Sequence, residues 1–284
     1  MDAEAIAALR CPVCHQPLDV DRRSLCCPVG HRFDLARQGH VDLSRGRVTH
    51  QGDTAEMVTA RAVLLAAGHL ASVSDALAGA VARDAAGLVV DVGAGPGHHL
   101  AKILDARSGL CGLAVDVSQA ALRKAARAHR RAVAVRADVW RALPIATASA
   151  RVVLDVFAPR APREFHRVLR ADGQLIVATP TRAHLREIAE PLGLIAIDPQ
   201  KEQRLSSTLT PLFAPSEIRE RTAVVRLSHE EIRTLVLMGP SARHLAPETL
   251  STRLARLPRQ VDVTVSVSIG IWLPRGDDGG DGPG

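Results

Sequence analysis

Four cysteines and a histidine lie close together near the N-terminus, in the stretch "RCPVCHQPLDVDRRSLCCPVGHRFDLARQGHVDL". Two residues separate Cys11 from Cys14, and three separate Cys27 from His31. Two such pairs on neighbouring turns are typical of a structural zinc site, in which four ligands close a tetrahedral shell. Cys26 competes with Cys27, but only Cys27 keeps the spacing to His31. We therefore predict one structural zinc on Cys11, Cys14, Cys27 and His31; ordinary buried thiols are the alternative.

A second chemical motif is the glycine-rich segment "GLVVDVGAGPGHHLAKIL", which begins at residue 87. It is typical of a buried strand that runs into a tight turn and then an amphipathic helix. Gly93, Gly95 and Gly97 remove side chains where a backbone must approach a ligand closely. A dinucleotide site would need its third glycine at position 98, where this chain has His98. NAD is therefore disfavoured, although a fold for another nucleotide remains open.

Acidic side chains follow three of the predicted strands. Asp91 precedes the glycine turn, Asp116 ends the apolar segment 109–118, and Asp138 ends the segment 132–139. A carboxylate in the position of Asp116 can accept hydrogen bonds from both hydroxyls of a ribose. We expect these side chains at one edge of a sheet, around a nucleotide ligand.

The elements that position these residues alternate along the chain. Further strands are predicted in "ARVVLDVFAP" and "GQLIVATP", with helices expected at 97–107, 118–130 and 161–170. This alternation predicts an α/β fold with a doubly wound parallel sheet. Together with the cysteine-rich segment, it indicates a larger domain that carries a small N-terminal zinc-binding domain.

Composition is consistent with one large core and a small satellite domain, because 46% of the 284 residues are hydrophobic. We predict a small zinc-binding domain at 1–50, a helical connector at 51–87, an α/β domain at 88–274 and a disordered tail at 275–284. The sequence contains no run of 18 apolar residues and no secretory signal pattern. We therefore expect a cytoplasmic protein without a membrane partner.

The pattern Asp-x-Gly-x-Gly-x-Gly from Asp91 resembles motif I of class I S-adenosylmethionine-dependent methyltransferases. With the zinc motif, the chain resembles the bacterial 23S rRNA (guanine-N1)-methyltransferases from about Cys11 to Trp272. The resemblance is carried by "CPVCHQPL", "CPVGHRFDLARQGHVDL", "GDTAEMVTAR" with "AAGHL", "DVGAGPGHH", "FAP" and "ATPTRAHL". Family members that act on hairpin 35 include macrolide-resistance enzymes, and the Ala- and Arg-rich composition favours the tylosin or mycinamicin branch.

The resemblance implies that residues 1–50 are an RNA-recognition domain and that residues 88–274 are a methyltransferase domain. It also implies S-adenosylmethionine as cofactor and N1 of a guanine as target, at nucleotide 748 or alternatively 745 of the rRNA. It places the following residues at the cofactor: Asp91, Gly93, Gly95, Gly97, His98, Asp116, Asp138, Leu70 and His184. Two positions depart from the family pattern. Leu70 stands where members often carry an aromatic residue, and Phe157 stands where tyrosine is found.

Methyl transfer from a sulfonium is an in-line displacement, so the protein mainly aligns the reacting atoms. Guanine N1 carries a proton, so a base or donors to O6 should help the reaction. Asp155, His184 and Phe157 are candidates for catalysis. Stacking of an unstacked base could use the aromatic residues Phe33, Trp140, Phe157 and Phe165. The chain lacks the Asn/Asp-Pro-Pro-Tyr motif of amino-group methylases.

Basic residues predict where RNA binds. The chain has a net charge of +6, and its 36 basic residues include only Lys102, Lys124 and Lys201 as lysines. Arginine suits bidentate contacts to phosphate or guanine. We predict RNA contacts from Arg22, Arg23, Arg32, Arg37, Arg45 and Arg47. The segment 123–141 is a second basic region, for which solvated surface is the alternative.

We expect a 23S rRNA hairpin as the partner, and a homodimer remains possible. Two other functions stay open. One is methylation of a small molecule, for which the zinc motif and the arginines would be incidental. The other is a non-catalytic zinc- and RNA-binding protein, which the complete glycine loop disfavours.

Overall fold

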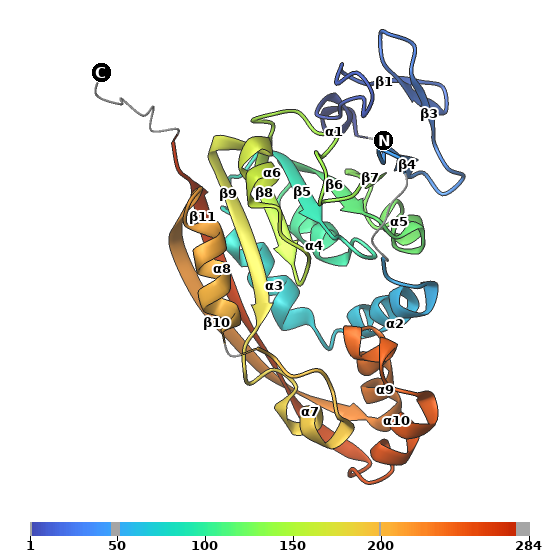
Figure 1. The fold of residues 1–284 in the computed structure, drawn as a ribbon, viewed down its shortest axis with the longest axis vertical. Coiled ribbons are helices and arrows are strands. Elements are labelled where there is room, and N and C mark those ends of the chain that lie inside the picture. The colour runs from blue at the N-terminus through green and yellow to red at the C-terminus, as the bar shows by residue number, and fades with distance from the viewer. Residues whose placement is uncertain (1, 47–51, 199, 277–284) are drawn as a thin grey trace.

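The computed structural model describes residues 2–46, 52–198 and 200–276 (Figure 1). Across these residues the main sheet has eight strands in the order β10-β11-β9-β8-β5-β6-β7-β4. The strands are β4 (Val41–Asp42), β5 (Gly87–Val92), β6 (Leu110–Asp116), β7 (Ala132–Arg136), β8 (Ala150–Val156), β9 (Leu169–Pro180), β10 (Phe213–Ser228) and β11 (Gln260–Pro274).

The strands from β4 to β9 run parallel, which confirms the predicted doubly wound α/β sheet. The chain proceeds from β5 through β6 to β7 on one side and continues with β8 and β9 on the other. The connections therefore reverse direction beside β5, and ligands of open α/β sheets bind at such a point, beyond the carboxyl ends of the strands. The antiparallel hairpin of β10 and β11 beside β9 was not predicted.

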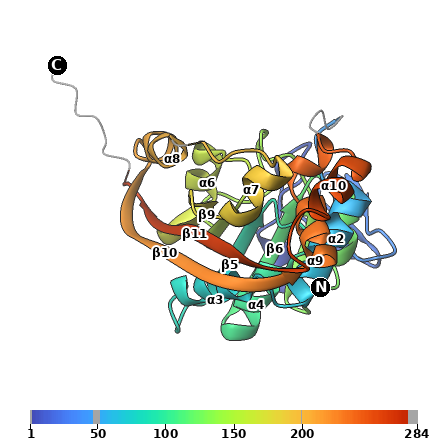
Figure 2. The same ribbon diagram turned by 90° about the horizontal axis from the view of Figure 1, so that it is seen from below.

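Helices cover both faces of the sheet. Figure 2 shows α3 (Ala71–Ala80) and α4 (His98–Ala106) on one face, and α6 (Pro162–Val168), α7 (Arg186–Leu192) and α8 (Lys201–Leu209) on the other. Successive strand residues belong to two hydrophobic cores on opposite faces of the sheet. Val89 packs in the cluster with α3 and α4, whereas Val90 packs in the cluster with α6. This alternation follows from the two-residue period of a strand.

The remaining helices pack on the strands or on other helices. They are α1 (Ala3–Ala7), α2 (Ala55–Ala66), α5 (Gln119–Ala125), α9 (His229–Leu237), η1 (Pro240–Arg243) and α10 (Pro247–Leu254). The helices α2 and α3 fall in the range expected for the connector. Thr54 caps α2 by accepting a hydrogen bond from Met57 N at 3.2 Å, and Gly68, with a φ of +82°, lies between the two helices.

The N-terminal segment packs directly on the sheet. Its small sheet contains β1 (Asp19–Asp21), β2 (Ser24–Cys26) and β3 (Arg32–Asp34), and β4 then joins the edge of the main sheet beside β7. Leu9 forms an isolated bridge with Ile145, and the buried Leu25 belongs to the same hydrophobic cluster as Val90 of β5. The N-terminal segment and this face of the sheet therefore share one core.

Two predictions concern segments at the limits of the described residues. Most of the tail predicted to be disordered, 275–284, lies outside them, as does Arg47. Among the described residues no single helix has the length and apolar character needed to cross a bilayer; α2 and α3 meet these criteria only as a pair, with a bend of 81° between them.

Candidate cofactor, substrate and metal sites

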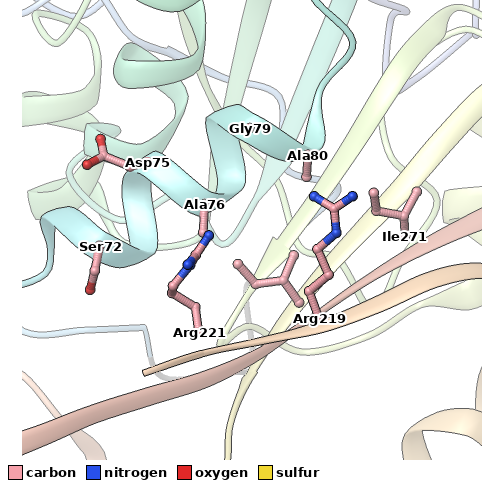
Figure 3. A pocket seen from close by; sticks show the side chains of 9 residues that line it. Ser72, Asp75, Ala76, Gly79, Ala80, Arg219, Arg221 and Ile271 are labelled. Carbon is pink, nitrogen blue, oxygen red and sulfur yellow. The ribbon is translucent and has the colours of Figure 1, made fainter. Parts of the chain in front are cut away.

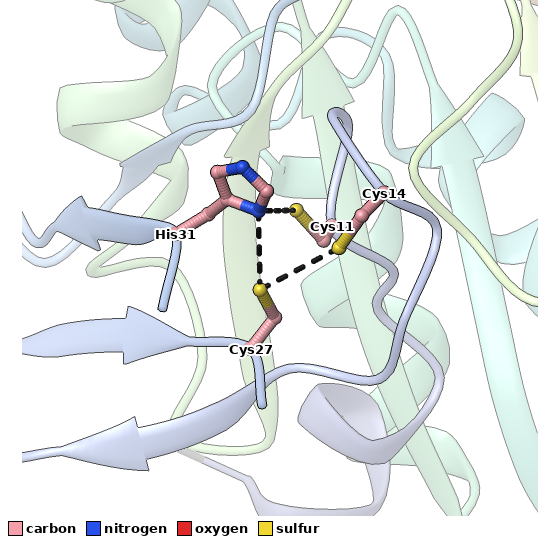
Figure 4. A group of neighbouring side chains, drawn as sticks. All are labelled: Cys11, Cys14, Cys27 and His31. Carbon is pink, nitrogen blue, oxygen red and sulfur yellow. Dashed lines mark hydrogen bonds between the residues drawn. The ribbon is translucent and has the colours of Figure 1, made fainter. Parts of the chain in front are cut away.

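Cys11, Cys14, Cys27 and His31 converge on one point in the N-terminal segment (Figure 4). Their ligand atoms all lie within 4.8 Å of one another. Nδ1 of His31 is 3.3 Å from Sγ of Cys27 and 3.6 Å from Sγ of Cys11. Three sulfurs and one imidazole nitrogen in this arrangement match the donor set of a closed zinc site. Cys26, on β2, is not in this group.

Tight turns bring the two ligand pairs together. His15 N donates to Cys11 O at 2.9 Å, and Gly30 N donates to Cys27 O at 2.9 Å. Gly30 has a φ of +95°, which a glycine adopts without strain. Burial alone would raise the pKa of the Cys27 thiol, but hydrogen bonds that involve His31 and Cys14 outweigh it and lower the pKa to about 6. A low pKa favours the thiolate, which is the form that binds metal.

The glycine loop lies between the segment after β8 and helix α2. Gly93, Gly95 and Gly97 all have positive φ angles. A Cβ placed on Gly93 would lie 2.6 Å from Cβ of Ala158, and one on Gly95 would lie 3.3 Å from the guanidinium of Arg61. A side chain at Gly93 would therefore clash with Ala158, and one at Gly95 would crowd Arg61.

Asp116 fixes the shape of this loop. One carboxylate oxygen accepts a hydrogen bond from Gly95 N at 2.9 Å, and the other accepts one from Ser118 N at 2.7 Å. Burial raises the pKa of Asp116, and these backbone donors oppose the shift. Each oxygen has a second lone pair, so the side chain can still accept hydrogen bonds from ribose hydroxyls.

Asp138 lies in the turn after β7 and is 5% exposed. Its Oδ1 accepts a hydrogen bond from Trp140 N at 3.0 Å. Its Oδ2 has no hydrogen-bond partner among the described residues, and Nε of Arg141 is 4.0 Å away. A buried acceptor without a donor is costly, and the amino group of an adenine could supply that donor.

Arg61 is a candidate cofactor residue that was not singled out from the sequence. It forms an ion pair with Asp53 and donates to Met238 O at 2.8 Å. Its guanidinium also faces Gly95, and its charge, with that of Asp53, acts on the pKa of Asp116. A cation beside the glycine loop can bind the carboxylate of a methionine moiety. The sequence clue was the spacing of Asp53 and Arg61 in "GDTAEMVTAR", about two helical turns, which allows the two side chains to pair.

Two further carboxylates lie at the carboxyl ends of β5 and β8. Burial, with the nearby charges of Asp116 and Asp155, raises the pKa of Asp91 to about 8. Burial also raises the pKa of Asp155 to about 7, although Arg160 opposes the shift. The side chain of Asp155 is 0% exposed, so it cannot touch a substrate in this conformation.

Phe157 and His184 form an aromatic pair at the carboxyl end of β8. Their ring centroids are 6.4 Å apart, with an angle of 30° between the planes. Phe157 is 47% exposed and has a φ of +56°, a conformation that is uncommon outside glycine and often marks functional sites. Nδ1 of His184 accepts a hydrogen bond from Ser266 N at 3.2 Å, so neutral His184 carries its proton on Nε2. Burial and the charge of Lys201 lower the pKa of His184 to about 4.

Sequence comparison identifies the family. A protein of Streptomyces fradiae named 23S rRNA (guanine(748)-N(1))-methyltransferase is 45% identical over 280 residues, covering 96% of this chain and 99% of that protein. A Micromonospora griseorubida protein with the printed name "Putative 23S rRNA (guanine-N(1)-)-methyltransferase" is 48% identical over 294 residues, covering 96% and 100%. This chain belongs to the 23S rRNA (guanine-N1)-methyltransferase family.

Family models divide this methyltransferase into two parts. Residues 9–44 match the zinc ribbon described as "RlmA, N-terminal", and residues 90–177 match a methyltransferase domain. The methyltransferase domain implies S-adenosylmethionine as methyl donor, and the zinc ribbon with its Cys/His cluster indicates a structural zinc.

Solved structures show the same fold. A chain from the complex between the Haloferax volcanii Trm112 methyltransferase activator and a methyltransferase has a TM-score of 0.53 at 14% identity, covering 80% of this chain and 100% of its own. The YcgJ protein of Bacillus subtilis has a TM-score of 0.50 at 13% identity, covering 72% and 98%.

The other predicted residues of this methyltransferase occupy different environments. Leu70 is buried just before α3, and His98 is the first residue of α4. Phe165 is fully buried in the core, whereas Trp140 is 55% exposed. Phe33 is half-buried against the core of the N-terminal segment. Of the four stacking candidates, Phe157 and Trp140 thus present exposed rings.

The arginines predicted to bind RNA lie on the surface of the zinc ribbon. Five of them are described and exposed: Arg22, Arg23, Arg32, Arg37 and Arg45. Arg32 forms an ion pair with Asp21.

A pocket of about 320 Å³ lies apart from these sites, between α3 and the β10–β11 hairpin (Figure 3). Arg219 and Arg221 of β10 and Asp75 of α3 line it. It contains none of the glycine-loop residues, so it is not the cofactor site.

Proposed function

We propose that this chain transfers a methyl group from S-adenosylmethionine to N1 of a guanine in a hairpin loop of 23S rRNA. The observation that carries the proposal is the exposed ring of Phe157, next to a complete glycine loop and on the same body as a zinc ribbon with exposed arginines. A small-molecule site would have no use for the last of these features. The 45% identity to a guanine-748 enzyme supports the same target.

The zinc is structural in this proposal, and its ligands are Cys11, Cys14, Cys27 and His31. Four protein donors leave no position for a reactive water. The metal instead holds together short strands that could not form a stable sheet of their own.

The proposed cofactor site extends over the glycine loop. Asp116 and Asp138 accept hydrogen bonds from the ribose and from the adenine amino group, and Arg61 binds the methionine carboxylate. Asp91, Leu70 and His98 shape the surrounding pocket. The bound cofactor supplies an electrophilic methyl group on a sulfonium. The protein aligns this methyl with guanine N1 and needs no metal for the transfer.

Phe157 is the proposed stacking surface for the target base, and His184 supports its ring from behind. Stacking on an aromatic side chain stabilises an extruded base by about 1–3 kcal/mol, which offsets the few kcal/mol that unstacking costs. Because Nδ1 of His184 is already an acceptor, its free Nε2 can donate a hydrogen bond but is not a base.

The ribbon arginines bind the phosphates of the hairpin stem, where contacts follow RNA shape rather than sequence. We propose hairpin 35 as the substrate, with nucleotide 748 as the methylated guanine and macrolide resistance of the tylosin type as the consequence. The reaction takes place in the cytoplasm, where the rRNA is made.

Primer extension on 23S rRNA tests this function. Cells that express the protein should show a new stop beside the modified guanine, because an N1 methyl group blocks Watson-Crick pairing. Cells that express Asp116→Ala should show little or no stop, and expression of the wild type should raise the tylosin concentration that inhibits growth. The proposal is wrong if 23S rRNA shows no stop while the purified protein methylates a small metabolite.

A further inference from the structure

An ion pair between Asp53 and Arg61 lies beside the glycine loop. Nη1 of Arg61 donates a hydrogen bond to Oδ2 of Asp53, and a Cβ placed on Gly95 would lie 3.3 Å from the same nitrogen. One atom of the guanidinium thus contacts both the carboxylate and the loop. The side chains of Arg61 and Asp53 are 28% and 24% exposed. The ion pair is therefore fixed in place but is not closed off from solvent.

The backbone of Asp53 is fixed to the segment after β6. Oγ of Ser118 donates a hydrogen bond to Asp53 O at 2.7 Å, and Ser118 N donates to Oδ1 of Asp116 at 2.7 Å. Oδ2 of Asp116 in turn accepts a hydrogen bond from Gly95 N at 2.9 Å. These contacts close a ring that includes Gly95, Asp116, Ser118, Asp53 and Arg61. The ion pair is therefore held next to the carboxylate that is proposed to bind the ribose.

Both members of the ion pair keep spare hydrogen-bonding capacity. Nη2 of Arg61 donates to Met238 O at 2.8 Å, so the five N–H donors of the guanidinium have two acceptors within the described part of the chain. The Asp53 carboxylate accepts one hydrogen bond from the described residues, that from Arg61, although its two oxygens offer about four acceptor positions. Unused donors and unused acceptors therefore lie close together beside the loop.

The charges of the ion pair match one end of the proposed cofactor. The amino-acid end of S-adenosylmethionine carries an α-ammonium and an α-carboxylate on the same carbon. A single cation in the site would attract the carboxylate and repel the ammonium. A cation and an anion that are neighbours attract both groups, and such complementarity gives specificity for a zwitterion.

We propose that Asp53 binds the α-ammonium of the cofactor while Arg61 binds its carboxylate, so that the ion pair selects a zwitterionic amino-acid end. This assignment rests on the proposed function, which places Arg61 at that carboxylate. It gives Asp53 a contact with the ligand in addition to its hydrogen bond with Arg61. Adenosyl compounds that lack either charged group should bind less tightly, because one member of the pair then has no ligand partner.

Titration calorimetry of the full chain with three ligands tests the role of Asp53. S-adenosylmethionine carries both charged groups, decarboxylated S-adenosylmethionine keeps only the amine, and 5′-methylthioadenosine has neither. Asp53→Asn removes the negative charge but keeps an acceptor for Arg61. It should weaken binding of the first two ligands by about 10- to 100-fold, the range for loss of a hydrogen bond to a charged group. Binding of 5′-methylthioadenosine should be unchanged.

Arg61→Met should give a different pattern with the same ligands. It should weaken S-adenosylmethionine by about 10- to 100-fold but should not weaken decarboxylated S-adenosylmethionine, which has no carboxylate. Asp172→Asn is the matched control. Asp172 also forms ion pairs with arginines, but it lies near the start of β9, at the opposite end of the sheet from the glycine loop. This control should bind all three ligands as wild type does.

Three results with Asp53→Asn would overturn the assignment. A wild-type affinity for S-adenosylmethionine would exclude a contact with the ligand. An equal loss for all three ligands would show that Asp53 only supports the fold. A loss for S-adenosylmethionine without a loss for its decarboxylated form would show that Asp53 acts only through Arg61. None of these measurements needs RNA, so the proposed function fails separately, if wild type binds S-adenosylmethionine but leaves 23S rRNA unmethylated.

Discussion

Asp116 connects the cofactor to the loop that surrounds it. Replacing Asp116 by Ala should weaken binding of S-adenosylmethionine by roughly 1.5–3 kcal/mol, the range for a hydrogen bond to a charged acceptor. The substitution also releases Gly95 N and Ser118 N, so the loss should fall at the upper end of that range. Titration calorimetry measures the affinity. Asp262→Ala, an exposed position on β11, is the control. Equal affinities for the two variants would show that Asp116 does not bind the cofactor.

Asp91 should make the stability of the cofactor-free protein depend on pH. Its pKa is raised by burial to about 8 from a usual value of 3.8, so the native state keeps a proton that the unfolded chain loses. The stabilisation is complete below about pH 4 and is lost as the pH rises towards 8. The pKa of Asp155, raised to about 7, has the same effect: its contribution to stability is lost as the pH rises towards 7.

Urea unfolding at pH 5 and pH 8 checks this sign. Wild type should lose stability between the two values, and Asp91→Asn should lose less, because its amide does not ionise. Asp155 remains in the variant, so some dependence should persist. A slope in Asp91→Asn equal to that of wild type would show that Asp91 ionises normally in the folded protein.

Residue spacing was informative wherever the relevant side chains are close in sequence. The two ligand pairs were found in this way, and their ligand atoms lie within 4.8 Å of one another. The glycine loop was found in the same way, and its glycines lie close to neighbouring segments of the chain. Arg61 was not selected as a site residue, because it lies on α2, outside the glycine-loop motif, and only the fold brings it beside Gly95.

At the scale of elements, the zinc ribbon should stabilise the sheet on which it packs. Cys11→Ser should lose the metal, whereas Cys26→Ser should keep about one zinc per chain, measured by elemental analysis. Because Leu25 and Val90 share a core, metal loss should also lower the thermal unfolding temperature of the whole chain. A Cys26→Ser variant without zinc would show that the ligand set is wrong.

The predicted elements are most accurate in the parallel part of the sheet. Continuous apolar segments followed by glycine or an acid identified β5 to β9, because such strands are buried on both faces. The hairpin of β10 and β11 was not identified, since β10 lies at an edge and alternates charged with apolar residues. An amphipathic edge strand of this kind carries a weaker signal than a buried one.

For the whole molecule, the exposed arginines of the zinc ribbon should determine the affinity for RNA but not the affinity for the cofactor. The triple variant Arg22→Ala, Arg23→Ala, Arg37→Ala removes three exposed cations and should reduce the slope of log K against log salt by up to about 2 on a single-stranded scale. Fluorescence anisotropy with a labelled hairpin measures the slope. The affinity for S-adenosylmethionine should stay at the wild-type level. If the salt dependence of RNA binding is unchanged in the triple variant, these arginines do not contact the RNA, and the basic segment 123–141 becomes the candidate contact.

The pairing of β4 with β7 has a consequence for the order in which the protein assembles as it is synthesised. Asp42 and Arg136 are 94 residues apart in sequence and form an ion pair at 2.8 Å. All four proposed zinc ligands leave the ribosome before any residue of β7, so the nascent ribbon can bind its metal early. Its apolar side then remains uncovered until the strands beneath it are made, and a chaperone has its longest opportunity to act during that interval.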